Sequence, residues 1–348
     1  MLVKDYIQEQ PKLAGRMIDE LPAAYAGLLP ASPPEAVLLV GTGSSMNALM
    51  TALPLFRKTG VPVVLVSPQE CLESLDTMPS GKVLSIVVSQ SGESIDTLHT
   101  TEALLRREGS VIVLTGNPDS PLAQTGAAVA AMPVADEQIG PKTKGYSATA
   151  LALQIFGHAL TRQDIPADTK NALSDMETFA LQSERWAVDF AQRAAESDVL
   201  VVLGQKEHVG TASEGSLKIA EMSGLPSFGL ETEEMSHGRF HGLTEKSLVC
   251  FITATDAEYD FACRMKAAIK YFSIGSEILD FRASGKPAEV AGLRWTSRDT
   301  NPLLAPIIAA LPFQFLAMHT ALVKGIDPEK MRYPTMGKFL KIKVGTAA

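Results

Sequence analysis

Short apolar runs alternate with amphipathic segments along most of the chain. In the first half the runs predict strands at residues 36–40, 61–66, 83–88, 111–114 and, more weakly, 127–132. Helical patterns at residues 46–57 and 95–107 lie between them, and a first helix is predicted from residue 3 to about residue 29. Fully apolar strands that alternate with helices are typical of a parallel sheet covered by helices on both faces.

The same alternation restarts near residue 198. It predicts strands at 198–203, 248–253 and 277–280 and helices at 211–223 and 259–271. Residues 145–195 have a helical pattern, at 147–160 and 168–193. The chain is therefore predicted to be an α/β protein with two doubly wound parallel-sheet domains. The expected organisation is an N-terminal helical segment (1–34), a first domain (35–160), a helical linker (161–196), a second domain (197–340) and a C-terminal tail (341–348).

Composition narrows the class of protein. The chain has 348 residues, of which 46% are hydrophobic and 20% charged, and a net charge of −8. This charge argues against nucleic acid or an acidic membrane as a main partner. Cys71, Cys250 and Cys263 are not spaced as metal ligands or as a redox pair, so all three are expected to be reduced. With neither a signal-peptide pattern nor an apolar run of about 18 residues, a cytoplasmic protein outside the membrane is expected.

Hydrogen-bonding side chains follow the apolar run 83–88, in the order Ser89-Gln90-Ser91-Gly92-Glu93-Ser94. Small hydroxyls and free backbone N–H groups where a strand gives way to a helix can bind a phosphate. A serine-rich helix N-cap is the alternative. One cap needs only one side chain, however, and this loop has three serines and a glutamine, so phosphate binding is favoured.

A second polar loop, Gly41-Thr-Gly-Ser-Ser45, follows the run 36–40. It suggests a dinucleotide-binding turn, but Met46 stands where that turn requires a small residue. An acidic residue is also missing directly after the next predicted strand. Gly43, Ser44 and Ser45 are therefore interpreted as further donors to a small anion. Ligands of such folds bind at the carboxyl ends of the strands, where these loops are predicted to lie.

The two loops resemble the phosphate-binding motifs of sugar isomerase (SIS) domains, and the duplicated halves of the chain resemble the tandem arrangement in that family. The resemblance covers about residues 35 to 340 and implies two flavodoxin-like domains. It implies that the substrate phosphate is held by Ser45, Ser89, Gln90, Ser91 and Ser94. The segment 140–146 resembles a Ser/Thr-Thr-Lys loop of the family, which places Thr143 and Lys144 at the site. An exposed basic loop is the alternative for these two residues.

Glu214, Lys218 and Glu221 fall on one face of the predicted helix 211–223, because positions i, i+4 and i+7 are stacked. Such a stripe can be a solvated face with ordinary ion pairs. It also resembles the Glu-Gly-x-x-Lys-x-x-Glu helix of the family, and Glu233–Arg239 resembles the family's Glu-x-x-His-Gly-Pro turn. The resemblance implies that Glu221 is the base and His237 the acid, and that Glu214 and Lys218 position the substrate.

The resemblance further implies an obligate homodimer in which the His237 loop enters the neighbouring subunit's site, and no metal or organic cofactor. Within the family the chain resembles the isomerase half of glucosamine-6-phosphate synthase and the fructosamine 6-phosphate deglycases. Three departures are notable. The chain starts without a glutaminase pattern. Met336 stands in place of the synthase's ring-opening lysine, with Lys338 two residues later. Arg239 replaces the usual proline. These departures favour a deglycase of 6-phosphorylated sugar–amino acid adducts. An isomerase or deaminase of amino-sugar 6-phosphates, and a non-catalytic sugar-phosphate sensor, are the alternatives.

Overall fold

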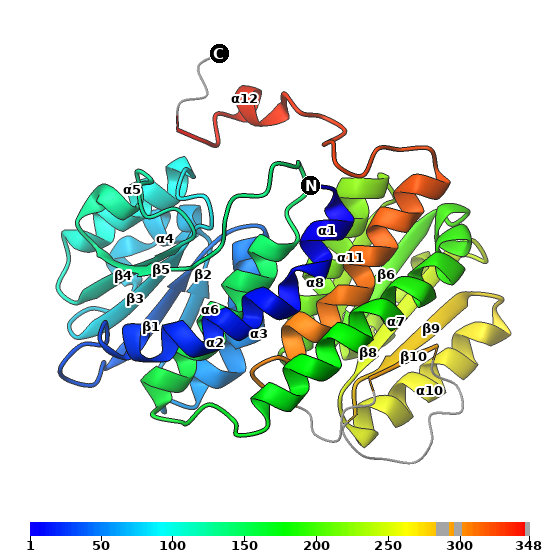
Figure 1. Ribbon diagram of the computed structural model, residues 1–348, viewed down its shortest axis with the longest axis horizontal. Coiled ribbons are helices and arrows are strands. Elements are labelled where there is room, and N and C mark those ends of the chain that lie inside the picture. The colour runs from blue at the N-terminus through cyan, green and yellow to red at the C-terminus, as the bar shows by residue number, and fades with distance from the viewer. Residues whose placement is uncertain (283–291, 296–300, 345–348) are drawn as a thin grey trace. The chain divides into compact units, whose positions relative to one another are not determined.

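The computed structural model describes residues 1–282, 292–295 and 301–344, and two separate β-sheets organise it (Figure 1). The first sheet is parallel throughout, with the strand order β2-β1-β3-β4-β5. Its strands are β1 (Ala36–Val40), β2 (Val63–Val66), β3 (Val83–Val88), β4 (Ser110–Thr115) and β5 (Ala128–Ala131). Every residue of β1 and β3 is buried. That burial explains why these two strands read as continuous apolar runs.

The second sheet repeats this plan. It is also parallel, with the order β10-β9-β8-β6-β7. Its strands are β6 (Val199–Gly204), β7 (Ser227–Glu231), β8 (Ser247–Thr253), β9 (Gly275–Asp280) and β10 (Leu293–Arg294). Counted within its own half, each sheet has the order second, first, third, fourth, fifth, which is the flavodoxin-like order. The predicted fold class, two doubly wound parallel-sheet domains in tandem, is confirmed.

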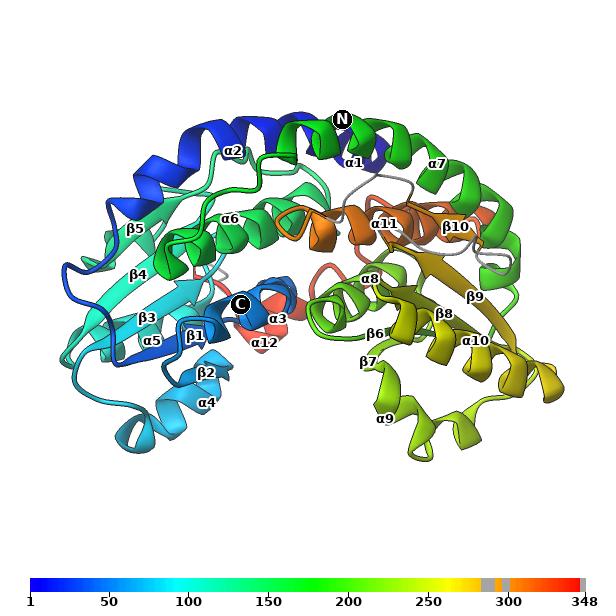
Figure 2. The ribbon, with the colours of Figure 1, turned by 90° about the horizontal axis from the view of Figure 1, so that it is seen from below.

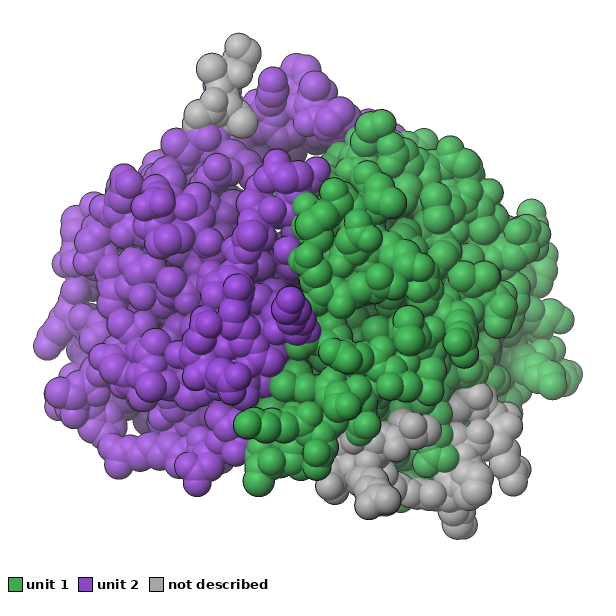
Figure 3. Space-filling view, in the orientation of Figure 1, with its two compact units in different colours: residues 1–11, 139–143, 166–332 green, residues 12–138, 144–165, 333–348 purple. Residues whose placement is uncertain are grey.

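Two compact units divide the chain, and Figure 3 colours them separately. Unit 1 comprises residues 1–11, 139–143 and 166–332 and contains the second sheet. Unit 2 comprises residues 12–138, 144–165 and 333–348 and contains the first sheet. The helices of unit 2 are α2 (Gln10–Ala26), α3 (Ser44–Arg57), α4 (Pro68–Glu73), α5 (Ile95–Leu105), α6 (Lys144–Thr161) and α12 (Met336–Leu340).

Helices cover both faces of the second sheet. The helices of unit 1 are α1 (Val3–Gln8), α7 (Thr169–Ala195), α8 (His208–Ser223), α9 (Thr232–Ser236), α10 (Asp256–Tyr271) and α11 (Ala305–Val323), of which α8 and α10 pack directly on the strands and α1 packs on α11. Val201 and Phe251 pack in one apolar cluster with Ile269 of α10. Their strand neighbours Val202 and Cys250 point to the opposite face, because side chains alternate along a strand, and they are equally buried. Figure 2 shows the helices around this sheet.

The N-terminal segment differs from its prediction. A single helix from residue 3 to about residue 29 is wrong, because α1 ends at Gln8 and α2 begins at Gln10. Pro11 explains the break. It has no N–H to donate to the carbonyl of Ile7, and its ring crowds that carbonyl, whereas a proline is tolerated in the first turn of a new helix.

Helix α11 was not among the predicted elements, and it corrects the expectation that the chain lacks an apolar run of membrane-spanning length. Its mean hydropathy is 1.6 over an 18-residue window, enough by length and composition to cross a bilayer. However, 83% of that window is buried inside the protein. The helix packs on α7 and α8, and a Cβ on Gly215 of α8 would lie 2.8 Å from the ring of Phe313. Its apolar surface thus forms part of the core of unit 1.

Candidate functional site

The loop after β3 is shaped by a glycine. Gly92 has φ +67°, and a Cβ there would lie 2.0 Å from the hydroxyl oxygen of Ser120. The position therefore requires glycine for both its backbone conformation and its close packing. This conformation folds the loop back on itself, so that the amide of Gly92 donates to the carbonyl of Ser89 at 3.1 Å.

The serines of this loop are not used as an ordinary helix cap. Ser94 occupies the N-cap position of α5, but its side chain accepts no hydrogen bond from a backbone amide of the helix. Ser94 instead accepts from the Thr97 hydroxyl at 3.0 Å. The Ser89 and Ser91 hydroxyls accept from loop amides at 3.2 and 3.4 Å. A hydroxyl that accepts keeps its own proton, so both can still donate to an anion.

Gly43, Ser44 and Ser45 lie at the same edge of the first sheet. β1 pairs directly with β3, with Val40 opposite Val87, so both loops leave neighbouring parallel strands at their carboxyl ends. β1 is also where the strand order reverses. Gly43 has φ +56° and is the N-cap residue of α3, and Ser44 begins the helix. The structure thus brings the two predicted phosphate loops together at the N-termini of α3 and α5, a position that favours anions.

The corresponding edge of the second sheet has a different charge character. Asp280, at the end of β9, is fully buried and binds Arg282 at 2.9 Å. Arg282 also binds Asp256 at 2.6 Å and lies over the ring of Tyr259. This edge is occupied by carboxylates and by an arginine that already has two acidic partners. A phosphate is therefore less favoured here than at the first sheet.

Thr143 and Lys144 are buried, with exposures of 0% and 6%. The alternative of an exposed basic loop is therefore excluded. The buried carboxylate of Glu137 accepts the backbone amides of Lys144 and Gly145 at 3.3 and 2.9 Å. Glu137 thus caps the N-terminus of α6. Sequence analysis missed this residue, which lies in a loop seven and eight positions before the two amides that it binds.

The acidic–basic stripe on α8 is not a solvated face. Glu214 and Lys218 are 0% and 2% exposed, whereas Glu221 is 22% exposed. The Lys218 ammonium lies 3.3 Å from a carboxylate oxygen of Glu214 and 2.5 Å from one of Glu221. Helical spacing brings all three together, and Glu221 is the carboxylate among them that reaches solvent.

Two opposing effects act on the Lys218 ammonium. Burial by itself favours the neutral amine, but the charges of Glu214 and Glu221 and their hydrogen bonds outweigh it and raise the pKa of Lys218. Lys218 is therefore a fixed cation and a poor proton donor at neutral pH. Its ammonium holds the Glu221 side chain in place and offsets the charge of the buried Glu214.

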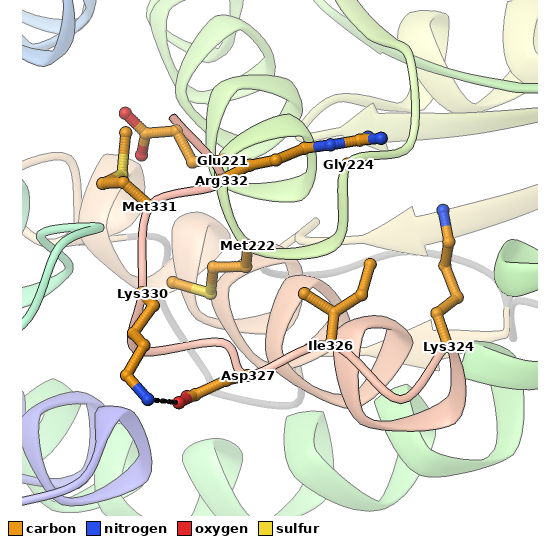
Figure 4. Close-up of a pocket in the computed structure, with 9 residues that line it drawn as sticks. All are labelled: Glu221, Met222, Gly224, Lys324, Ile326, Asp327, Lys330, Met331 and Arg332. Carbon is orange, nitrogen blue, oxygen red and sulfur yellow. Dashed lines mark ion pairs between the residues drawn. The ribbon is translucent and has the colours of Figure 1, made fainter. Parts of the chain in front are cut away.

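A pocket of about 450 Å³ opens beside Glu221 (Figure 4). It lies at the C-terminal end of α8, and the segment that follows α11 forms its other wall. Its lining residues are Glu221, Met222, Gly224, Lys324, Ile326, Asp327, Lys330, Met331 and Arg332. The candidate base therefore faces a cavity large enough for part of a small-molecule ligand.

His237 lies immediately after α9 and is 69% exposed. Its Nε2 atom is 3.9 Å from a carboxylate oxygen of Glu233, which is itself 72% exposed. Arg239 similarly lies 3.8 Å from Glu234. Both pairs are weak surface contacts. Glu221 is not among the contacts that the structure gives His237 within the described part of unit 1.

The C-terminal tail contacts the phosphate loop, which sequence analysis did not predict. Lys343 bridges to Ser94 as a short antiparallel pair, and its ammonium lies 3.1 Å from the Glu93 carboxylate. The Ile95 amide donates to the carbonyl of Ile342 at 3.2 Å. Lys338 lies on the short helix α12 and is exposed. Lys343 and its neighbour Ile342 thus reach the predicted phosphate loop, whereas within the described residues no hydrogen bond or ion pair joins Lys338 to it.

Comparison with known proteins agrees with this architecture. A sequence model of the SIS domain matches residues 32–159. The glutamine–fructose-6-phosphate aminotransferase (isomerizing) of Thermococcus kodakarensis is 24% identical over 310 residues, which are 86% of this chain and 51% of that protein. The chain therefore spans about half the length of this curated relative.

Solved structures share the fold over nearly the whole chain. Glucosamine-6-phosphate deaminase from Thermotoga maritima superposes with a TM-score of 0.77 at 20% identity, covering 95% of this chain and 97% of its own. Tagatose-6-phosphate ketose/aldose isomerase from Escherichia coli gives 0.79 at 17% identity, covering 95% of both chains. At these identities the likeness concerns the fold. The sequence match to the SIS domain thus covers residues 32–159, and the likeness over the rest of the chain is one of fold, in two sheets of equal topology.

Proposed function

We propose that this protein is a phosphosugar enzyme that cleaves a 6-phosphorylated sugar–amino acid adduct into a sugar 6-phosphate and a free amine. The observation that carries the proposal is the position of Glu221. Its carboxylate is held 2.5 Å from a buried ammonium and lines a pocket of about 450 Å³. A positioned carboxylate at a cavity is the main requirement for moving a proton between neighbouring carbons.

The chemistry requires proton transfers alone. In a fructosamine-type adduct Glu221 takes a proton from C1, next to the C2 carbonyl, while the C2 oxygen gains a proton, and an enaminol forms. Addition of a proton at C2, with loss of the N–H proton, leaves a C1=N imine. Water then adds to C1 and the C1–N bond breaks, with a proton transferred to the departing nitrogen. The sum is adduct plus water giving aldose 6-phosphate plus amine. No electrons leave or enter, so the residues of the chain suffice for the acid–base steps.

The other predicted residues have defined roles in this scheme. Ser45, Ser89, Gln90, Ser91 and Ser94 bind the phosphate, with Gly43 and Ser44 shaping the loop and Thr143 and Lys144 beside it. His237 protonates the leaving nitrogen or opens the sugar ring, as a general acid. Its high exposure fits a loop that acts in the site of a second copy of the chain, in a homodimer. We place the enzyme in the cytoplasm.

An aldose–ketose isomerase or a deaminase of amino-sugar 6-phosphates is the second candidate. It is favoured by the same observation, because the proton shift between C1 and C2 is common to isomerisation and deglycation. The two differ in what occupies the pocket beyond Glu221. A sensor that binds sugar phosphates without turnover would have no use for this held carboxylate.

Turnover of a small panel tests the proposal. The substrates are fructoselysine 6-phosphate, glucoselysine 6-phosphate, fructose-asparagine 6-phosphate, glucosamine 6-phosphate and fructose 6-phosphate. Release of amine from an adduct by the wild type, lost in Glu221→Gln, is the expected result. Glu177→Gln, which changes an exposed carboxylate on α7 in the same unit, is the matched control. Conversion of the simple sugar phosphates alone assigns an isomerase or deaminase, and binding without any turnover assigns a sensor.

A further inference from the structure

The side chain of Gln90 lies in a slot between two glycines of unit 2. Gly116 follows β4, and Gly145 is the second residue of α6. A Cβ on Gly145 would lie 3.4 Å from Cδ of Gln90, and a Cβ on Gly116 would lie 3.2 Å from its Nε2. The slot therefore fits the amide group closely, because neither wall carries a side chain.

The main chain of Gln90 is held at the same place. Its carbonyl accepts the Gly116 amide at 2.9 Å and the Thr115 hydroxyl at 3.3 Å. Its side-chain amide is half-buried and makes no hydrogen bond to the other residues that the structure describes. An amide that is already oriented in this way can donate to an anion without first breaking a bond within the protein.

Glu137 fixes one wall of this slot. Its carboxylate is 1% exposed and accepts the amides of Gly145 at 2.9 Å and of Lys144 at 3.3 Å. One of its oxygens lies 3.2 Å from the Cβ position of Gly145, which is the position that Gln90 also contacts. Charge-assisted hydrogen bonds are strong, so the carboxylate sets where the first turn of α6 lies against the side chain of Gln90.

Capping of α6 alone would not require a charge at this position. An ordinary N-cap is a short side chain directly before the helix. Glu137 instead reaches the helix from an earlier loop, and its carboxylate is removed from water to do so. A buried anion beside a predicted phosphate loop also repels the ligand. A second contribution, which offsets these costs, is therefore expected of this residue.

We propose that Glu137 is a positioning residue for phosphate binding and acts through the side chain of Gln90. The inference rests on the proposed function, which assigns Gln90 to the phosphate. A ligand that has to order a long, free side chain loses part of its binding energy to that ordering. The slot orders the Gln90 amide before the ligand arrives, and Glu137 holds one wall of the slot in place.

Two competing explanations predict other results. If Glu137 only caps α6, its loss lowers the stability of the protein and leaves the affinity for a phosphate ligand unchanged. If its charge acts directly on the ligand, neutralising that charge tightens binding, because two anions repel one another. Positioning alone predicts that binding becomes weaker when the contact with α6 is disturbed.

Two substitutions disturb this contact in different ways. Glu137→Gln keeps the shape of the side chain, but its NH2 group faces one of the two backbone amides that the carboxylate accepts. Glu137→Asp keeps the charge and shortens the reach, so it separates geometry from charge and remains usable if the first variant does not fold.

Gln154→Met is the matched control. Gln154 is also on α6, is 4% exposed and donates to the Thr51 carbonyl at 3.0 Å. It lies ten positions after Lys144 and therefore about 15 Å further along the helix axis. Its substitution removes a buried hydrogen bond of the same helix without touching the slot around Gln90.

Binding of glucitol 6-phosphate to the full chain provides the measurement, because this ligand has no carbonyl and cannot be isomerised or cleaved. Isothermal titration calorimetry gives its dissociation constant, and urea unfolding gives the stability of the same proteins. We expect both Glu137 variants to bind roughly three- to tenfold more weakly than the wild type. Gln154→Met should be destabilised and bind like the wild type. In a Gln90→Met background the Glu137 substitutions should have no further effect on binding.

Unchanged binding in both Glu137 variants overturns the inference in favour of a structural cap, and tighter binding in Glu137→Gln overturns it in favour of direct repulsion. An equal loss with and without the Gln90 amide also overturns it, because Glu137 then acts by another route. No binding by the wild type overturns it together with the predicted phosphate site. Turnover is measured separately. Weaker binding in the variants without cleavage of any adduct supports the inference and rejects the deglycase, whereas adduct cleavage with unchanged binding rejects the inference and leaves the deglycase.

Discussion

The Lys218 ammonium lies 2.5 Å from the Glu221 carboxylate and is itself only 2% exposed. A second carboxylate, Glu214, is fully buried on its other side at 3.3 Å. The triad is therefore held together inside α8 and the neighbouring core, with one edge open to the pocket. Loss of its central cation would leave Glu214 buried and without that partner.

Lys218→Met should accordingly destabilise the protein and inactivate it. Removing one partner of a buried ion pair costs about 3–5 kcal/mol, because the remaining charge stays in a medium of low polarity. Urea unfolding measures this loss. The double variant Glu214→Gln/Lys218→Met should recover part of it, since it removes the stranded charge as well. A double variant that is less stable than Lys218→Met alone would contradict this account.

The two predicted phosphate loops each contain a glycine at a positive φ, and the two glycines form a matched pair. Gly92→Ala and Gly43→Ala both place a side chain at a positive φ, which costs roughly 1–2 kcal/mol. At Gly43 nothing lies within 4 Å of the new Cβ, so the cost should end there. At Gly92 the Cβ would overlap Ser120, which should add about 1–3 kcal/mol. Thermal unfolding would measure both effects, and similar losses in the two variants would contradict the packing argument.

The protein should lose stability as the pH falls below about 6.5, the unperturbed pKa of histidine. Burial lowers the pKa of His208, against the opposing charges of Glu207 and Glu258, so the folded protein binds its proton later than the unfolded chain. The stability from His208 is thus present above pH 6.5 and is lost as the pH falls toward the lower folded-state pKa. The slope for one group is at most about 1.4 kcal/mol per pH unit.

His208→Phe isolates this contribution. The substitution keeps a ring beside Phe281, on which His208 stacks, and removes the titrating group. The pKa values of His158 and His319 are lowered in the same direction, so the variant should retain a reduced slope and not a flat profile. Unfolding free energies between pH 5 and 8 provide the comparison. An unchanged slope in His208→Phe would show that His208 does not contribute to the acid sensitivity.

Deletion of residues 342–348 should expose the start of α5. The Ile95 amide, which donates to Ile342 in the intact chain, would lose its acceptor and exchange faster with solvent. The Leu98 amide donates to Ser94 within the helix and provides the internal control. Hydrogen-exchange mass spectrometry would detect the difference. Unchanged exchange at Ile95 would mean that the pairing with the tail does not persist in solution.

Local patterns in the sequence predicted the architecture well. β1 and β3 are buried on both faces, so their apolar runs were unambiguous, and the polar loops that follow them lie where the strands end. The stripe of Glu214, Lys218 and Glu221 follows from the helical repeat alone. The helical repeat does not indicate whether these three side chains are buried. The solvated-face alternative was excluded only by the packing around α8.

Other features depend on contacts between distant segments, which a single sequence does not encode in its local pattern. β7 (Ser227–Glu231) was missed because it is an edge strand, half-buried, with a glycine in the middle. The bridge between Lys343 and Ser94 joins residues about 250 positions apart, as does its ion pair with Glu93.

The two sheets share one strand order, so α3 and α8 are equivalent helices, each following the first strand of its half. Their candidate functional residues nevertheless lie at opposite ends: Ser44 and Ser45 in the first turn of α3, Glu221 in the last turn of α8. Under the proposed function, the duplicated scaffold keeps its anchoring element and its reactive element in separate copies. Mutations that tune affinity for the phosphate can then accumulate without disturbing the proton-transfer chemistry, which gives such a chain room to diverge toward new substrates.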